Sequence, residues 1–147
     1  MVGLVAEALY QLGAEHMLVV HCGGLDELAP VAVATVATVT RAGVSTGSLD
    51  PFALGFAKCS LSDLKGGDRK ENAETLRLVL AGKLPGAVTD TVVLNAGAGL
   101  HVAGVAASVA EGCAMAKEAV LAGRPMQTLE AWVDAARDCA NYEPGQF

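Results

Sequence analysis

Hydrophobic and polar positions follow two different periods along the chain, and these periods divide it into helices and strands. Over residues 3–12 the apolar positions fall three or four apart, as on one face of a helix, and Gly13 is placed to end that helix. Residues 17–20 are wholly apolar, which is typical of a buried parallel strand. Residues 31–40 are mostly β-branched and predict a second strand, with a possible return strand over 44–49.

Four further helices are expected in the rest of the chain. Two begin at capping boxes, in which the N-cap side chain and one three residues later satisfy backbone amides: Asp68 with Glu71 before residues 69–81, and Ser108 with Glu111 before residues 108–122. A third helix is predicted over 90–103 with Asp90 as its N-cap. The last, over 128–139, is predicted to turn four apolar side chains inward: Leu129, Trp132, Val133 and Ala136. The segment after Tyr142 is expected to fray.

This order of elements predicts an α/β fold built on a partial parallel sheet with flanking helices. Parallel strands need partners supplied through crossover connections, yet residues 17–21 follow only one helix. That strand would keep an open edge unless another segment covers it. The chain therefore resembles the back part of a larger α/β domain. Apolar surface at residues 17–20 and 94–102 is expected to lie exposed and to promote self-association.

Composition narrows the possible partners. The chain has 147 residues, 52% of them hydrophobic, and a formal charge of −6. Its lysines and arginines form no basic stripe, which argues against nucleic-acid binding. Residues 91–110 carry no charge, but they are rich in alanine and glycine and lack basic flanks, so a buried helix pair is favoured over a membrane span. The four cysteines show neither CxxC spacing nor zinc-ligand spacing and indicate reduced thiols. No targeting segment is recognisable on this chain.

Candidate chemistry begins beyond the predicted strand at 17–21. There the adjacent carboxylates Asp26 and Glu27 follow a glycine-containing loop, a position where ligands collect in α/β sheets. Carboxylate oxygens are hard ligands suited to Mg²⁺, which completes its shell with water and phosphate. A solvated acidic pair or a helix N-cap is the alternative explanation. His21 is interpreted as a hydrogen-bonded structural histidine rather than a general base, and Cys22 as an inert thiol.

Residues 65–68, Lys-Gly-Gly-Asp, form a second candidate site. A helix N-terminus behind two glycines can present backbone amides to a phosphate. Asp68, however, occupies the place that an anion would take, and the sequence matches neither GxGxxG nor a Walker motif. Residues 65–68 are therefore interpreted as a helix entry, with Asn72 satisfying backbone groups nearby.

Five ordered blocks of the sequence resemble the C-terminal part of the anthranilate phosphoribosyltransferase family: LVVHCGGLDELAP, LDPFALGF, DLKGGDRKENAETLRLVLAGKLPG, DTVVLNAGAGL and AEGCAMAKEAVLAGRPMQTLEAW. The segments HCGGLDE and KCSLSDLKGGD are most similar to those of the plant and algal members, which are plastid enzymes of tryptophan biosynthesis. The resemblance implies the back part of a phosphoribosyltransferase or nucleoside-phosphorylase-like α/β domain over residues 1–147. It implies a location in the chloroplast stroma for a plant or algal protein, and in the cytoplasm otherwise.

The resemblance also implies an activity and its ligands. Family members transfer phosphoribose from phosphoribosyl diphosphate to the amine of anthranilate, and Mg²⁺ neutralises the diphosphate that leaves. The family's metal carboxylates correspond to Asp26 and Glu27. Two nearby positions depart from the family pattern, with Ala29 where serine is common and Ala32 where glycine is common.

Several parts of the family's site have no counterpart in these residues. They are the N-terminal helical domain through which the family dimerises, the glycine-rich diphosphate loop, the Asn-x-Ser-Thr and Lys-His-Gly-Asn segments, and the arginine that holds anthranilate. The chain is therefore expected to be a fragment that is inactive alone and needs the missing N-terminal segment, with homodimer formation through the helical domain a possibility for the complete enzyme. The alternative is a non-catalytic scaffold or interaction subunit related to that enzyme.

Overall fold

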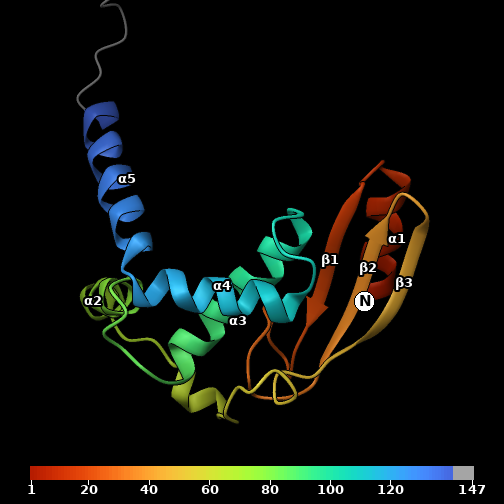
Figure 1. Ribbon diagram of the computed structural model, residues 1–147, viewed down its shortest axis with the longest axis horizontal. Helices are drawn as coiled ribbons and strands as arrows, with labels where there is room; N and C mark the ends of the chain where they lie inside the picture. The colour runs from red at the N-terminus through yellow and green to blue at the C-terminus, as the bar shows by residue number, and fades with distance from the viewer. Residues whose placement is uncertain (141–147) are drawn as a thin grey trace, which may run out of the picture.

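A computed structural model describes residues 1–140 of the chain (Figure 1). Its elements, in chain order, are α1 (Val2–Gln11), β1 (His16–His21), β2 (Ala34–Thr40), β3 (Gly43–Leu49), the short 3-10 helix η1 (Leu61–Leu64), α2 (Arg69–Leu80), α3 (Ala87–Val102), α4 (Val109–Leu121) and α5 (Arg124–Ala140). The α/β class and the predicted order of helices and strands are confirmed. The expectation for the segment after Tyr142 lies outside the described residues.

The predicted parallel pairing is wrong. The described sheet has the order β1-β2-β3, and both pairs are antiparallel, with Val20 opposite Val36 and Thr40 opposite Gly43. The two-residue connection between β2 and β3 permits only an antiparallel hairpin, and the segment between β1 and β2 contains no crossover helix. The apolar run in β1 has a different cause, because both faces of the strand are covered. Val19 packs towards α1, whereas Leu18 and Val20 pack towards α3 and α4.

Two apolar cores result from this arrangement. The smaller lies under α1 and is formed by Ala6, Ala37 and Val39, all with no exposed surface. The larger fills the space between the opposite face of the sheet and the pair α3–α4, and it includes Leu28, Leu94 and Cys113. In Figure 1 the sheet and α1 form one end of the molecule, α3 and α4 cross its middle, and α2 and α5 form the other end.

Close packing of α3 on α4 depends on two glycines. A Cβ atom added to Gly97 would lie 2.5 Å from the backbone nitrogen of Cys113, and one added to Gly112 would lie 2.2 Å from the carbonyl oxygen of Gly97. Real side chains do not approach so closely, so the helix backbones touch at this crossing. The uncharged segment at residues 91–110 is thus explained by helix pairing. Within residues 1–140, no helix has the length and hydropathy needed to cross a bilayer.

The predicted helix ends are correct in part. Asp68 and Glu71 form the expected capping box, and Ser108 accepts from the amide of Glu111, although the Glu111 carboxylate accepts from Ala107. Asp90 is not the N-cap of α3, because that helix starts three residues earlier behind Gly86.

The prediction for α5 is also partly wrong. This helix begins at Arg124 instead of residue 128, and only one of its four predicted inward side chains, Leu129, is buried. Trp132 is 71% exposed and Ala136 is exposed. The cause is that α5 extends away from the other helices (Figure 1), so most of its apolar face has no neighbour among the described residues.

The predicted exposed apolar surface is present only in part. Met17 is 38% exposed, and a hollow of about 370 Å³ lies between β1 and α3 beside it. Leu94, in contrast, is fully buried in the larger core, because α3 turns this side chain towards Leu28 and α4. The expectation therefore holds for the start of β1 and is wrong for Leu94.

Candidate functional site

A tight turn at the end of β1 presents the two candidate metal carboxylates. Cys22 and Leu25 exchange reciprocal backbone hydrogen bonds of 3.1 and 2.9 Å, which close a two-residue turn. The two central residues, Gly23 and Gly24, have φ of 58° and 92°, a conformation that other L-residues rarely adopt. The chain leaves this turn at Leu25, so Asp26 and Glu27 follow immediately, and both are exposed.

The chain is fixed again directly after the carboxylates. Leu28 is 1% exposed, and both of its backbone polar groups bond to one side chain of α3. The Leu28 amide donates to Asn95 Oδ1 at 3.0 Å, and Asn95 Nδ2 donates to the Leu28 carbonyl at 2.6 Å. Asn95 Nδ2 also donates to the carbonyl of Thr91, one turn earlier in α3, at 2.8 Å. All hydrogen-bonding groups of this carboxamide are therefore engaged with backbone.

Beneath this segment, Cys22 acts as a structural thiol. Its Sγ atom is buried and donates to the carbonyl oxygens of Ala29 and Ala32 at 3.1 and 3.2 Å. The carbonyl of Pro30 accepts in turn from the amide of Cys59 at 2.9 Å. The interpretation of Cys22 as inert agrees with this geometry.

Asp26 borders a hollow of about 510 Å³ between α1 and the sheet. His21 and Thr35 line the same hollow, together with apolar side chains of α1 and β1. His21 is exposed, so it is not enclosed as a structural histidine within the described residues. Strand pairing sets His21 opposite Thr35, and the turn adds Asp26, so an imidazole, a hydroxyl and a carboxylate border one open space.

The donor set suits a hard divalent cation. Magnesium binds proteins through one or two carboxylates and keeps several water molecules, and it does not require a closed cage of ligands. Asp26 and Glu27 are exposed neighbours at the end of a fixed turn and can serve this coordination. No group of three or more His, Cys, Asp or Glu side chains with metal-binding geometry occurs within residues 1–140. The remaining ligands would therefore be water and the ligand's own oxygens.

The second candidate, residues 65–68, is a self-capped helix entry. The Asp68 carboxylate accepts from the amides of Lys70 and Glu71 at 2.7 and 3.0 Å, and Glu71 accepts from the amide of Asp68 at 2.9 Å. Asn72 bonds both the amide and the carbonyl of Gly67, as predicted. The amides that a phosphate would need are occupied, so the interpretation as a helix entry is confirmed.

Two histidines that the sequence left unassigned meet across the fold. The rings of His16, in β1, and His101, in α3, pack edge to face with centroids 5.4 Å apart, and His101 Nδ1 lies 3.1 Å from the carbonyl of Ala106. Both histidines are partly exposed. Because these residues lie 85 positions apart in the sequence, the sequence gave no signal of this contact.

Comparison with known proteins identifies the family. A profile described as "Glycosyl transferase family, a/b domain" matches residues 1–126. The chain belongs to this family. It is 40% identical over 88% of its length to the anthranilate phosphoribosyltransferase of Mesorhizobium japonicum and 41% identical over 92% to that of Rubrobacter xylanophilus, and it spans only 38% and 40% of those proteins.

Solved structures agree with this assignment. Anthranilate phosphoribosyltransferase from Thermus thermophilus superposes with a TM-score of 0.84 at 39% identity, covering 92% of this chain and 40% of that one. The Saccharomyces cerevisiae enzyme in complex with PRPP and Mg gives a TM-score of 0.78 at 25% identity, covering 89% of this chain and 38% of that one. The chain thus spans less than half the length of each of these two enzymes.

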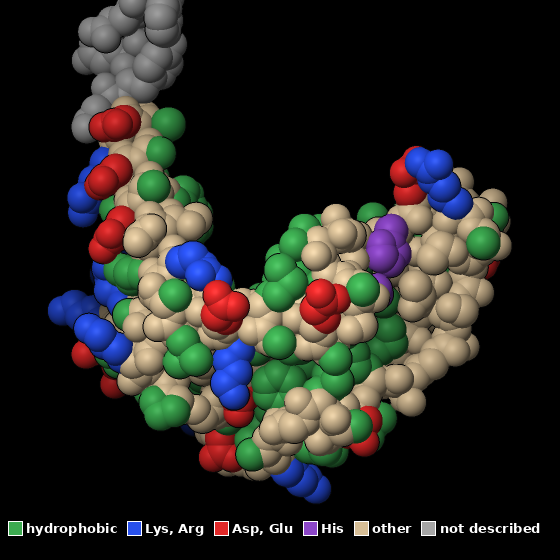
Figure 2. All heavy atoms as spheres, in the orientation of Figure 1, with side chains coloured by type: hydrophobic (Ala, Val, Ile, Leu, Met, Phe, Trp, Pro, Cys, Tyr) green, Lys and Arg blue, Asp and Glu red, His purple; other side chains and the backbone are tan. Residues whose placement is uncertain are grey.

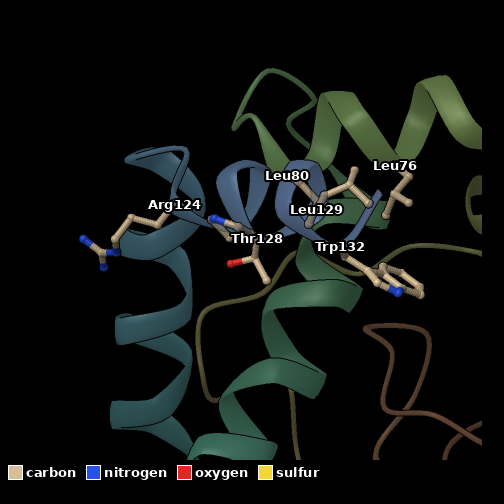
Figure 3. A pocket seen from close by; sticks show the side chains of 7 residues that line it. Leu76, Leu80, Arg124, Thr128, Leu129 and Trp132 are labelled. Carbon is tan, nitrogen blue, oxygen red and sulfur yellow. The ribbon is translucent and has the colours of Figure 1, made fainter. Parts of the chain in front are cut away.

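Most of α5 lies beyond the region matched to the glycosyl transferase family. An apolar groove of about 550 Å³ runs between α5 and α2, lined by Leu76 and Leu80 from α2 and by Thr128, Leu129 and Trp132 from α5 (Figure 3). The Arg124 guanidinium at its end contacts Glu118 at 3.4 Å. The groove shares no lining residue with the hollow beside Asp26. It contains no carboxylate, histidine or thiol, so we place the candidate chemistry at the turn after β1.

Sequence reasoning proposed Asp26 and Glu27 as metal ligands but gave Asn95 no role at this turn. One signal was available, because Asn95 is a strongly polar side chain in a run of twenty residues without charge. A carboxamide in such a helix needs hydrogen-bond partners when it is partly buried. The partner, Leu28, lies 67 residues earlier in the chain, and only the fold brings the two together.

Proposed function

We propose that this chain forms part of an enzyme that transfers phosphoribose from phosphoribosyl diphosphate to anthranilate, a step of tryptophan biosynthesis. The observation that carries the proposal is the 39% identity and TM-score of 0.84 with the Thermus thermophilus anthranilate phosphoribosyltransferase. The chain spans about 40% of that protein, so we assign the remaining substrate contacts to segments outside these residues. Dimerisation of the complete enzyme, and a plastid location if the source is a plant or alga, belong to the same proposal.

Within this proposal Asp26 and Glu27 hold a magnesium ion. When bound, the ion supplies positive charge that stabilises the diphosphate as it leaves. The two carboxylates would hold the cation, and their exposure would leave room for water and phosphate oxygens around it. The fixed turn before Asp26 reduces the number of conformations that must be ordered on binding.

The side chains that line the hollow beside Asp26 would contact the bound ligand and not the metal. The hollow beside Asp26 is lined mainly by apolar atoms of α1 and β1, and His21 and Thr35 contribute hydrogen-bonding groups to its wall. Apolar walls exclude water from charged groups and thereby strengthen their interactions. We assign His21 and Thr35 to contacts with polar atoms of the bound ligand.

A chimaera tests the proposal. In the Thermus thermophilus enzyme, the matching segment is replaced by this chain, and the loss of anthranilate fluorescence is followed with phosphoribosyl diphosphate and Mg²⁺. The chimaera should turn over, whereas the 147-residue chain alone should not. Asp26→Asn and Glu27→Gln should each lower turnover at limiting Mg²⁺ by at least about tenfold, since even residues behind metal ligands typically contribute 10–100-fold.

The controls separate failure to fold from failure to function. Glu130→Gln removes an equally exposed carboxylate from α5, far along the chain from the turn, and should leave turnover unchanged. A folded chimaera without turnover would contradict the proposed activity and favour the non-catalytic scaffold. Full activity of both carboxylate variants at limiting Mg²⁺ would contradict the metal assignment alone.

A further inference from the structure

Asp26 and Glu27 are the only residues between two points at which the backbone is fixed. On one side, Leu25 is held by its reciprocal hydrogen bonds with Cys22. On the other, both backbone groups of Leu28 are held by Asn95. A two-residue segment with both ends fixed has few conformations. The direction in which its carboxylates point therefore depends on the two anchors.

The two anchors differ in kind. The first is local, since it is formed within four consecutive residues and needs only the glycines of the turn. The second joins the segment to α3 across 67 residues of sequence and depends on one side chain. Asn95 is in turn fixed by its bond to the carbonyl of Thr91 within the same helix. Its orientation is settled by these partners, because a reversed carboxamide would direct its NH₂ group at the Leu28 amide.

We propose that Asn95 is a positioning residue, which holds Leu28 so that Asp26 and Glu27 present their carboxylates together to one divalent cation. The inference rests on the proposed function, because it assumes that these carboxylates bind the metal. The hydrogen bonds of Asn95 go to the backbone of Leu28 and Thr91 and not to either carboxylate, so it acts through the backbone of Leu28. Residues that orient metal ligands from behind typically contribute 10–100-fold to metal affinity.

Two substitutions separate the hydrogen bonds of Asn95 from its volume. Asn95→Leu has nearly the same size and removes every bond to Leu28. Asn95→Asp keeps the size but replaces the NH₂ group by a carboxylate oxygen, and repulsion from the carbonyls of Leu28 and Thr91 should move the side chain away from the Leu28 amide. Val120→Ala is the matched control, because Val120 is buried in the same core on α4 and makes no hydrogen bond to Leu28.

The experiment uses the 147-residue chain and Mn²⁺ as a spectroscopic substitute for Mg²⁺. Free Mn²⁺ is measured by electron paramagnetic resonance, and exchange of the Leu28 amide is measured by hydrogen–deuterium exchange. Both Asn95 variants should expose the Leu28 amide to faster exchange and weaken Mn²⁺ binding about tenfold or more. Val120→Ala should lower thermal stability while leaving the Leu28 amide protected and the Mn²⁺ affinity unchanged.

Asp26→Asn in the same titration separates the two proposals. If Asp26→Asn weakens Mn²⁺ binding and Asn95→Leu releases the Leu28 amide without changing the affinity, the positioning role is wrong and the metal assignment stands. If Asp26→Asn has no effect on Mn²⁺ binding, the metal assignment fails and the positioning role with it. Should Asn95→Leu prove unfolded by near-ultraviolet circular dichroism, Asn95→Asp decides the question by the same two measurements.

Discussion

At the scale of single residues, burial without a strong partner raises the pKa of Asp90. This carboxyl lies in the first turn of α3, and burial raises its pKa above the usual range, although Lys117 acts in the opposite direction. A group whose pKa is raised on folding binds more protons in the folded state than in the unfolded state. The free energy of unfolding therefore falls as pH rises from the usual pKa of an aspartate through that of folded Asp90.

Asp90→Asn should remove this part of the pH dependence. The variant should be more stable than the natural chain above the pKa of folded Asp90, and the difference should vanish below the pKa of an unfolded aspartate. Urea unfolding at a series of pH values measures this difference in the free energy of unfolding. Asp134→Asn, at an exposed position of α5, serves as the control. If the difference in unfolding free energy between Asp90→Asn and the natural chain did not change with pH between these two pKa values, the prediction would be wrong.

The four cysteines should differ widely in reactivity. Cys139 is exposed, whereas Cys22 is buried and donates its thiol to two carbonyls. Burial raises the pKa of the Cys113 thiol, and burial together with Asp63, Asp90 and Cys22 raises the pKa of the Cys59 thiol. Because the thiolate is the reactive form, iodoacetamide at neutral pH should label Cys139 first, as measured by peptide mass spectrometry. In denaturant all four should react alike, and rapid labelling of native Cys22 would contradict the structure.

At the scale of elements, local signals predicted more than long-range ones did. The capping box of α2 and the bounds of α1 follow from residues within a few positions of each other; the box was predicted, and the bounds were predicted to within one residue. The direction of strand pairing was not predictable from the apolar run in β1, because that run reports burial on both faces and not the orientation of a neighbour. Trp132 shows the opposite error. Its helical spacing was read correctly, but the neighbour that the apolar face would need is absent from the described residues.

The candidate site likewise combines a feature that local sequence indicates with a contact that only the fold creates. Asp26 and Glu27 could be proposed as metal ligands because they are adjacent and follow a strand, which a sequence displays directly. The contact of Asn95 with Leu28 depends on how α3 is placed against the turn, and this placement is set by the larger core. Sequence alone could indicate that Asn95 needs a partner, but it could not name Leu28.

The crossing of α3 and α4 offers a test of close packing. Gly97→Ala should destabilise the chain by about 1–3 kcal/mol or more, because its new Cβ would overlap the Cys113 backbone at 2.5 Å. Gly99→Ala is the matched control on the same helix, where no atom lies within 4 Å of the added Cβ. It should stabilise the chain by about 0.5–1 kcal/mol through helix propensity. Equal unfolding free energies for the two variants would show that the helices do not touch at Gly97.

At the scale of the whole molecule, apolar side chains lie exposed at both ends of a hollowed shape. Figure 2 shows the molecule hollowed between the arm formed by α5 and the end formed by the sheet. Leu4 on α1 is 72% exposed, Leu12 directly after α1 is 83% exposed, and Trp132 on α5 is 71% exposed. Scattered apolar residues are ordinary on soluble proteins, but here they accompany a strand, β1, that pairs on one side only among the described residues.

The isolated chain is therefore expected to self-associate and to bind a hydrophobic dye. Light scattering should give an average mass that rises with protein concentration, because an unpaired strand edge and adjacent apolar surface favour contact with a second chain. Met17→Lys places a charge on β1, where Met17 is 38% exposed, and should reduce the association. Trp132→Lys makes the same change on α5 and should have the smaller effect, since α5 offers no strand edge. A monodisperse monomer that melts cooperatively and binds no dye would show that residues 1–140 complete their own core. A larger effect of Trp132→Lys would assign the association to the groove between α2 and α5.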